Sequence, residues 1–496
     1  MDDYSSAKLK AYVKDGGGVA SVDLSEKGLS RVPDAVTELT EVEELKLINN
    51  NLTELPTSIN KLKNLIRLHL NSNKLTELPS EIGDLKELRS LDVRHNQLVS
   101  LPTSIQKLDQ LEELHLYGNR LTELPYEIGD LKELRRLDVR YNKLVSLPTS
   151  IQKLNQLEEL QLYGNRLKEL PSEIGDLKEL KKLYVGTNQL VSLPASIQKQ
   201  NQLKELHLYG NRLTELPSEI GDLKELRRLD VGYNQLVSLP TSIQKLNQLG
   251  ELYLYTNKLT KLPSKIGDLK ELRRLDVSNN QLVSLPTSIQ KQNQLEVLYL
   301  CGNRLTELPS EIGDLKELRR LDVRYNQLVS LPTSIQKLNE LEELHLSRNK
   351  LIELPSEIGD LKKLRMLDVS GNQLVSLPTS IQKLNQLDNL YLSGNKLTEL
   401  PSEIGDLKEL RKLDVSNNQL VSLPTSIQKL NQLEELYLYD NRLTELPSEI
   451  VDLRKLRRLG VRGNPLSSDE IHVPEMIKKE GMTSSVIAGG CGDNFQ

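Results

Sequence analysis

The sequence predicts an α/β solenoid: a curved right-handed superhelix with one parallel β-sheet on its concave face and turns, short 3₁₀ segments or short helical segments on its convex face. Three observations predict it. The pattern LxxLxLxxNxL, as in residues 111–121, returns every 23 residues without insertion or deletion. An asparagine marks the period at 19 positions, from Asn50 to Asn464. An equally regular segment containing proline and isoleucine follows every one of these asparagines except the last, Asn464.

The leucines of the pattern predict a short strand in each repeat. In residues 111–121, Leu114 and Leu116 alternate with Glu113, His115 and Tyr117. Alternate side chains of a strand point to opposite faces, so the leucines share one face. One repeat cannot bury that face alone, and stacking of successive repeats makes it a continuous core.

The asparagines and prolines predict how each strand turns away. An asparagine amide offers both a donor and an acceptor to loop backbone groups that would otherwise be buried unpaired, so we expect a ladder of buried asparagines. The following LPSEIGDL or LPTSIQKL segments contain a proline that fixes φ, and an Ile and a Leu on one side of a single helical turn. These segments are expected to form the convex wall.

The repeats predict one elongated domain with a cap at each end. Residues 19–466 hold 20 repeats, the first of them degenerate, with Lys27 in place of asparagine. From Leu78 onward the two repeat types alternate, which gives a unit of 46 residues. Residues 1–18 are expected to form a capping helix, residues 467–487 a C-terminal cap, and residues 488–496 a disordered tail.

These motifs resemble the leucine-rich repeat superfamily across residues 19–466. The form LPxxIGxLxxLxxLxVxxNxL is most similar to the 23-residue intracellular class, which includes Ras-pathway scaffolds, plant Ras-group proteins and the arrays attached to Roco GTPases. The resemblance implies a protein partner, with a small GTPase or signalling complex as a candidate.

Composition favours a protein partner in a reducing compartment. The 65 basic and 70 acidic residues nearly balance, which argues against nucleic-acid binding. There is no long apolar run, so membrane insertion is not expected. Two cysteines, Cys301 and Cys491, and a start without an apolar leader predict a cytoplasmic location. Cys301 falls on the concave face, where an accessible thiol is expected. We expect a monomer.

Motifs for catalysis are missing from the sequence. It contains no GxxxxGK[ST], GxSxG, HExxH or paired CxxC motif, so no catalytic residue, metal or cofactor is predicted. Histidines and aspartates do alternate at the fifth position of the strand pattern, as in Asp92, His115 and Asp138. Neighbouring strands lie about 5 Å apart, so each histidine is expected to bond an aspartate in a surface ladder.

The third strand position carries a ladder of alternating charge. It is expected to set the register of the sheet, with each pair contributing about 0.2 to 1 kcal/mol. The residues are Glu113, Arg136, Glu159, Lys182, Glu205, Arg228, Glu251 and Arg274.

The tyrosines mark the predicted binding surface. Of 16 tyrosines, 13 fall at positions 5, 7 or 8 of the strand pattern, and tyrosine gives large contact area at low entropic cost. The strand propensity of tyrosine is the alternative explanation. Against it, LPSEIGDLKEL is identical in five repeats while position 7 varies. The predicted protein-binding residues are Arg94, His115, Tyr117, Asp138, Arg140, Tyr141, Tyr163, Tyr184, Tyr209, Tyr233, Tyr253, Tyr255, Tyr299 and Tyr325.

The sequence thus predicts a non-enzymatic scaffold or adaptor that binds a protein on its concave face. Two alternatives remain open at this point. Nearly identical repeats with a varied concave face also suit a defence-type sensor that recognises a ligand. The other alternative is that the chain is the regulatory array of a larger Roco-type GTPase.

Overall fold

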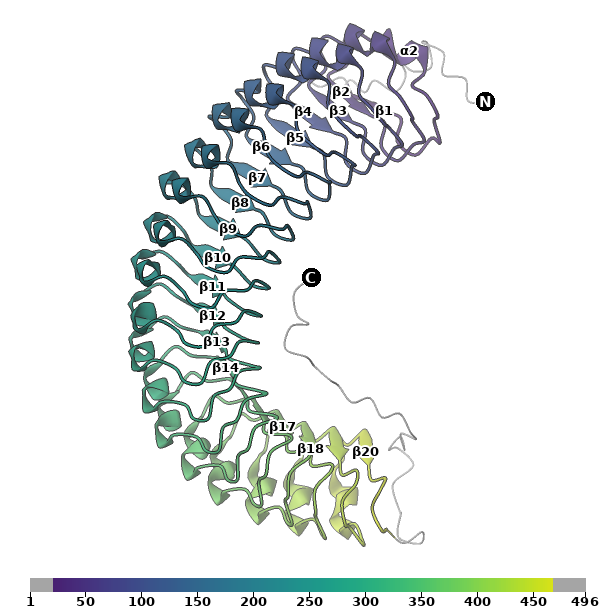
Figure 1. Ribbon diagram of the computed structural model, residues 1–496. Helices are drawn as coiled ribbons and strands as arrows, with labels where there is room; N and C mark the ends of the chain where they lie inside the picture. The colour runs from purple at the N-terminus through teal and green to yellow at the C-terminus, as the bar shows by residue number, and fades with distance from the viewer. Residues whose placement is uncertain (1–20, 467–496) are drawn as a thin grey trace. The chain divides into compact units, whose positions relative to one another are not determined.

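A computed structural model describes residues 21–466, which comprise twenty strands and the short helices between them (Figure 1). The chain divides into two compact units, Met1–Leu236 and Val237–Gln496. Both are built from the same 23-residue repeat. The predicted caps, residues 1–18 and 467–487, and the predicted tail lie outside the described residues.

Each described repeat contributes one strand of three residues. In the first unit the strands are β1 (Ser21–Asp23), β2 (Glu44–Lys46), β3 (Arg67–His69), β4 (Ser90–Asp92), β5 (Glu113–His115), β6 (Arg136–Asp138), β7 (Glu159–Gln161), β8 (Lys182–Tyr184), β9 (Glu205–His207) and β10 (Arg228–Asp230). In the second unit they are β11 (Glu251–Tyr253), β12 (Arg274–Asp276), β13 (Val297–Tyr299), β14 (Arg320–Asp322), β15 (Glu343–His345), β16 (Met366–Asp368), β17 (Asn389–Tyr391), β18 (Lys412–Asp414), β19 (Glu435–Tyr437) and β20 (Arg458–Gly460).

Within each unit, neighbouring strands pair in parallel and in strict register with the repeat. Leu114 of β5 lies opposite Leu137 of β6, and Leu252 of β11 lies opposite Leu275 of β12. These leucines are fully buried. Leucine therefore stacks on leucine along each unit, as the alternation of apolar and polar residues predicts.

Short 3₁₀ helices form the opposite side of each unit, which we call the helical face. The first unit has α2 (Asp34–Thr37), an α-helix, followed by η2 (Thr57–Lys61), η3 (Ser80–Asp84), η4 (Thr103–Lys107), η5 (Tyr126–Asp130), η6 (Thr149–Lys153), η7 (Ser172–Asp176), η8 (Ala195–Lys199) and η9 (Ser218–Asp222). The second has η10 (Thr241–Lys245), η11 (Ser264–Asp268), η12 (Thr287–Lys291), η13 (Ser310–Asp314), η14 (Thr333–Lys337), η15 (Ser356–Asp360), η16 (Thr379–Lys383), η17 (Ser402–Asp406), η18 (Thr425–Lys429) and η19 (Ser448–Asp452).

Proline fixes where each of these helices begins. Pro125 precedes η5 with φ of −64° and ψ of 151°, an extended conformation that suits a residue just before a helix. One turn later, Ile128 is buried and its carbonyl accepts a hydrogen bond from the N–H of Leu131. The helix thus lasts a single turn and returns the chain to the next strand.

Close packing between the helices gives a physical basis to the 46-residue unit. A Cβ added to Gly129 of η5 would lie 2.3 Å from the backbone oxygen of Ser150 in η6. Within the two units, the equivalent glycines approach the serine of the following TSIQK or ASIQK helix in the same way; they are Gly83, Gly175, Gly267, Gly313, Gly359 and Gly405. In η19, the last described helix, Val451 takes the place of the glycine and is 53% exposed. The two repeat types therefore form interlocking pairs.

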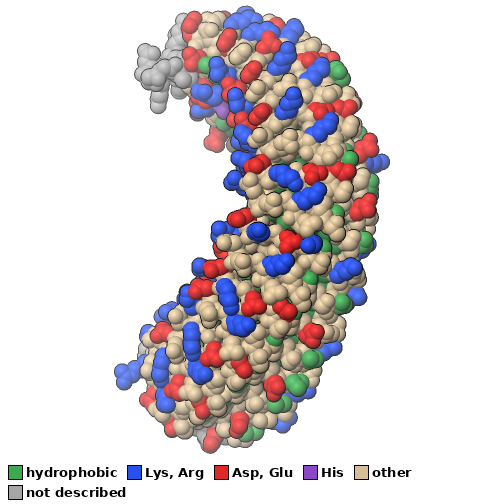
Figure 2. All heavy atoms as spheres, turned by 90° about the vertical axis from the view of Figure 1, so that its left-hand side faces the viewer, with side chains coloured by type: hydrophobic (Ala, Val, Ile, Leu, Met, Phe, Trp, Pro, Cys, Tyr) green, Lys and Arg blue, Asp and Glu red, His purple; other side chains and the backbone are tan. Residues whose placement is uncertain are grey.

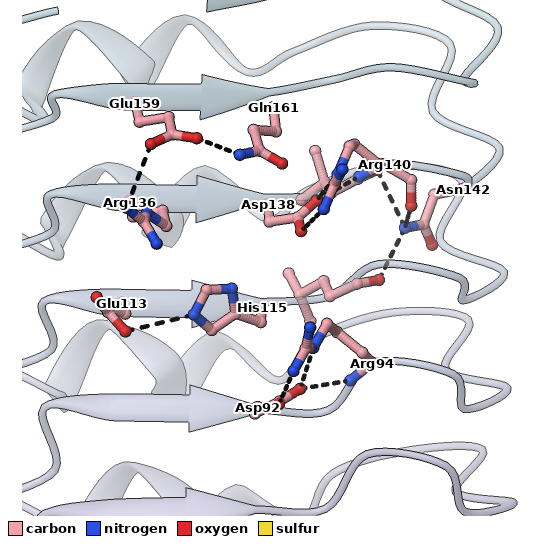
Figure 3. A network of polar contacts seen from close by, with 12 residues as sticks. Asp92, Arg94, Glu113, His115, Arg136, Asp138, Arg140, Asn142, Glu159 and Gln161 are labelled. Carbon is pink, nitrogen blue, oxygen red and sulfur yellow. Dashed lines mark hydrogen bonds and ion pairs between the residues drawn. The ribbon is translucent and has the colours of Figure 1, made fainter. Parts of the chain in front are cut away.

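The predicted asparagine ladder is confirmed. The Asn142 side chain donates from Nδ2 to the carbonyls of Leu116 and Val139, at 2.9 and 3.1 Å (Figure 3). Its Oδ1 accepts from the N–H of Leu121 at 3.0 Å. Asn142 is 7% exposed. Each such amide joins its own strand end to the preceding repeat. The predicted repeat solenoid, with a parallel sheet on one face and 3₁₀ helices on the other, is confirmed.

The charges of the helical face are mixed in sign. Figure 2 shows basic and acidic side chains interspersed over that face, without a large area of one charge. Pairs such as Lys153–Asp130, at 3.1 Å, join neighbouring repeats. Within residues 21–466, no helix is long and apolar enough to cross a membrane.

Candidate binding surface

Aromatic rings follow the strand ends of the first unit in a regular row, on the side opposite the helical face. They alternate between two places, the second residue before the asparagine on one strand and the residue directly before it on the next. We call this set the aromatic row: His95, Tyr117, Tyr141, Tyr163, Tyr209 and Tyr233. Thr187 interrupts it where a seventh ring would lie.

The backbone explains why the rings alternate with glycines. The residue directly before each asparagine has positive φ, 50° at Tyr141 and 71° at Gly164. This left-handed region strains a side chain other than glycine by about 1 to 3 kcal/mol. A Cβ on Gly164 would lie 3.0 Å from Tyr141 Cδ1, and one on Gly118 would lie 3.1 Å from His95 Nδ1. Each glycine therefore leaves room for the ring of the preceding strand.

The rings contact one another from strand to strand. His95 and Tyr117 have centroids 4.6 Å apart, and Tyr141 lies 5.3 Å from both Tyr117 and Tyr163. These are favourable edge-to-face or tilted geometries. Tyr141 nevertheless remains 50% exposed, while Tyr117 and Tyr163 are half-buried. Four consecutive repeats thus present a continuous aromatic surface.

The row continues beyond its interruption. Tyr209 and Tyr233 have centroids 5.2 Å apart, and Tyr233 is 45% exposed. At the gap, a Cβ on Gly186 would lie 2.8 Å from Tyr163 Cδ2, so this glycine accommodates the Tyr163 ring.

The sequence prediction did not include His95 or the glycines. The alternation of ring and glycine directly before the asparagine was the available signal.

The aspartates of the predicted ladder bond arginines instead of histidines. Asp138 is 3% exposed and accepts two hydrogen bonds from the Arg140 guanidinium, at 2.9 and 2.8 Å, and one from the Arg140 N–H at 3.1 Å (Figure 3). Asp92 and Arg94 form the same arrangement. Aspartate therefore closes the turn at the strand end, and Asp138 offers little surface to a partner. The guanidinium of Arg140 also lies 5.2 Å from the Tyr117 ring centroid.

The histidine–aspartate pairs expected at His115 and His345 are wrong. His115 Nε2 lies 3.4 Å from Glu113 Oε2 of its own strand (Figure 3). In the second unit, His345 Nε2 lies 3.2 Å from Glu343 Oε2. The rings turn along the strand because the neighbouring aspartate is already bonded to arginine or backbone. His115 is half-buried.

Part of the charge ladder forms as predicted. Arg136 lies 3.3 Å from Glu159 of the next strand, and Lys182 lies 3.4 Å from Glu205. The hydroxyl of Tyr184 donates to Glu205 at 2.9 Å, and its ring lies 4.6 Å from that of His207. Burial, followed by this hydrogen bond, raises the pKa of Tyr184. Tyr184 thus belongs to the sheet surface beside the row.

The predicted tyrosines of the second unit differ from one another in exposure. Tyr253 is only 3% exposed and bonds Glu251 at 2.8 Å, so its prediction as an accessible contact is wrong. Tyr255 is half-buried. Tyr299 and Tyr325, also half-buried, lie under the guanidiniums of Arg320 and Arg348 at 5.6 and 5.1 Å.

A cation between two rings was missed in the second unit. Lys412 Nζ lies 5.4 Å from the Tyr391 centroid and 5.3 Å from that of Tyr437, and 3.1 Å from Glu435. Tyr391 and Tyr437 are among the 13 tyrosines of the strand pattern but are not among the predicted binding residues.

Cys301 is 1% exposed and is not a free cysteine, so the accessible thiol expected from the sequence is wrong.

In the part of the chain that the structure describes, no group of three or more His, Cys, Asp or Glu side chains could hold a metal ion.

Two sets of family matches cover most of the described repeats. Models described as "Leucine-rich repeat region" match residues 68–141, 196–279 and 342–417, and those described as "Leucine rich repeat" match residues 132–190, 293–351 and 408–466. A further "Leucine Rich Repeat" match covers residues 271–292. A comparison with curated proteins gives no match.

The solved structure of a leucine-rich repeat protein from Leptospira interrogans is 40% identical to this chain, with a TM-score of 0.67; the match covers 78% of this chain and 92% of that one. The chain belongs to the leucine-rich repeat family. YopM from Yersinia enterocolitica is similar at 27% identity and a TM-score of 0.65, over 92% of this chain and 98% of that one. Leucine-rich repeat proteins are in general non-enzymatic binding scaffolds, and this fold suits protein–protein interaction.

A plant structure extends the comparison to a known complex. The plant peptide hormone receptor RGFR1, solved in complex with RGF2, is 33% identical to this leucine-rich repeat chain, with a TM-score of 0.69 over 90% of this chain and 78% of that one.

Proposed function

We propose that this leucine-rich repeat protein is a non-enzymatic scaffold or adaptor that holds a protein partner on the aromatic row of its first unit. The single observation that carries the proposal is the contact series from His95 to Tyr163. Four rings on consecutive repeats touch one another, yet Tyr141 keeps half of its surface exposed.

The energetics favour a binding role for these rings. A tyrosine in the left-handed region strains the fold where a glycine would not, as the Gly164 position shows. Strain of this kind persists at functional sites. Tyrosine is also a common hot-spot residue, because its ring buries a large area at little entropic cost.

Peptide recognition is the form of binding that the comparisons favour. The similar plant receptor was solved with a peptide hormone, and a row of rings along a sheet suits an extended segment of chain. We therefore propose that the partner presents a linear segment to the row. The sequence of that segment would decide whether this chain is an adaptor or a receptor-like sensor.

The test begins with selection of ligands from a random peptide display library on the whole chain. Calorimetry then compares wild type with the triple variant Tyr117→Ala, Tyr141→Ala, Tyr163→Ala. We expect binding to weaken by at least about 2 kcal/mol, since these rings would be the anchors. Circular dichroism of the variant checks that it remains folded.

Tyr126 provides a matched control. It is 56% exposed, but it lies in η5 on the helical face. We expect Tyr126→Ala to change affinity by less than about 0.5 kcal/mol. Ligands that tolerate the triple variant but lose affinity with Tyr126→Ala would place the site on the helical face and overturn the proposal.

A further inference from the structure

The spacing of the aromatic row carries an inference about the partner, which rests on the proposed function. Tyr117, Tyr163 and Tyr209 stand at the same place on every second strand. Parallel strands lie about 4.8 Å apart, so equivalent rings recur about every 9.6 Å. His95, Tyr141 and Tyr233 form a second series, offset by one strand, with Thr187 at its missing place.

This period matches one chain conformation better than the others. A polyproline II helix has three residues per turn and rises about 3.1 Å per residue, so it returns a side chain to one face about every 9.3 Å. An extended strand does so about every 6.7 Å, and an α-helix makes a turn about every 5.4 Å. Only the polyproline II helix stays in step with the row over several strands.

The chemistry of the row agrees with its spacing. The carbonyls of a polyproline II helix have no internal partners, so tyrosine hydroxyls can donate to them. Burial, followed by the neighbouring Tyr163, raises the pKa of Tyr141, which therefore remains a donor at neutral pH. The nearby cations Arg94 and Arg140 are already bonded to aspartates, which favours an uncharged ligand.

We propose that the aromatic row from His95 to Tyr233 binds a proline-rich segment in the polyproline II conformation. Every third residue of the segment packs between successive rings, and the conformation is largely formed before binding, which lowers the entropic cost.

Fluorescence polarisation on the whole chain tests the proposal with three labelled twelve-residue peptides: oligoproline, a flexible Gly-Ser peptide and an alanine-rich helical peptide. We expect only oligoproline to bind. Tyr117→Ala with Tyr163→Ala should weaken binding at least about tenfold, while Tyr126→Ala on the helical face leaves it unchanged. The double variant Tyr117→Phe, Tyr163→Phe keeps the rings and should lose less affinity for oligoproline than the double alanine variant.

Thr187 allows a test by gain of binding. Gly186 directly precedes Thr187 in the sequence, just as Gly232 directly precedes Tyr233. Gly210 lies at the equivalent of the Thr187 position in the next repeat. A Cβ on Gly210 would lie 3.3 Å from Thr187 Oγ1, so that glycine leaves room for a larger side chain. Thr187→Tyr should therefore complete the row and tighten binding of an eighteen-residue oligoproline more than that of a six-residue one.

Three outcomes would overturn the inference: equal binding of the Gly-Ser or helical peptide, oligoproline binding that tolerates loss of Tyr117 and Tyr163, or no oligoproline binding. The display selection separates this failure from failure of the proposed function. Selected ligands without proline that still require both tyrosines would leave the binding surface in place and exclude the polyproline II partner. Ligands that require neither tyrosine would overturn both.

Discussion

The ring of Tyr141 lies over the backbone of Gly164, where an added Cβ would come within 3.0 Å of Tyr141 Cδ1. Both residues have positive φ. The fold therefore tolerates glycine at this place on every strand, and tyrosine is the residue that is strained there.

Tyr141→Gly should separate stability from binding. Removing the side chain relieves left-handed strain while losing two ring contacts, so we expect the free energy of unfolding to stay within about 1 kcal/mol of wild type. Affinity for a selected peptide should fall. Denaturant titration and calorimetry on the same preparation measure both, and a loss of more than about 2 kcal/mol of stability would mean that the ring serves the fold.

Gly129→Ala should destabilise the first unit. The new Cβ would meet the Ser150 backbone oxygen, which cannot move as a side chain tip can, so overpacking should cost about 1 to 3 kcal/mol. Val451→Ala, at the equivalent place in η19, is the control and should change stability little because Val451 is exposed. Equal denaturation midpoints for wild type and Gly129→Ala would contradict the interlocking of paired repeats.

Two buried glutamines should be replaceable with a gain in stability. Gln200 and Gln292 directly follow η8 and η12, at a place where most repeats have leucine, and each is at most 1% exposed. Each amide nitrogen bonds a carbonyl of the preceding repeat, but each Oε1 has no hydrogen-bond partner among residues 21–466. Gln200→Leu and Gln292→Leu should each raise the free energy of unfolding by about 1 kcal/mol or more. A lower denaturation midpoint in both variants would show that the amide bonds outweigh the unpaired oxygens.

Glu44 should give the N-terminal repeats a specific acid sensitivity. Burial alone would raise its pKa, but hydrogen bonds from Ser21 and Arg67 and the charge of Lys46 outweigh burial and lower the pKa to about 2. The folded state thus holds the carboxylate more strongly than the unfolded chain, whose value is near 4.5. The stabilisation that the Glu44 carboxylate gives to the folded state is therefore complete above pH 4.5 and is lost as pH falls through about 2. The stability difference between wild type and Glu44→Gln should shrink over that range, and a constant difference would contradict the assignment.

The sequence predicted what depends on the period and missed what depends on side-chain geometry. Leu114, Ile128 and Asn142 lie where the repeat places them, because one backbone path serves every copy. The Gly129–Ser150 contact requires the distance between stacked helices, which no single repeat contains. His115 turned to Glu113 because Arg140 had already bonded Asp138, and such competition is invisible in a strand pattern.

The candidate surface shows the same division. The tyrosines at the strand ends could be recognised by position, and Tyr117, Tyr141 and Tyr163 do meet. Tyr253 and Tyr184 both stand at the fifth strand position, yet Tyr253 is buried and Tyr184 is half-buried, so position alone did not determine accessibility.

The most direct measurement of the central claim is site-specific photo-cross-linking of a selected peptide. A benzophenone amino acid replaces Tyr141 on the aromatic row in one protein and Tyr126 on the helical face in another, two places with similar exposure. The account predicts a cross-linked product from position 141 that excess unlabelled peptide suppresses, and none from position 126. A suppressible product from position 126 alone would contradict it.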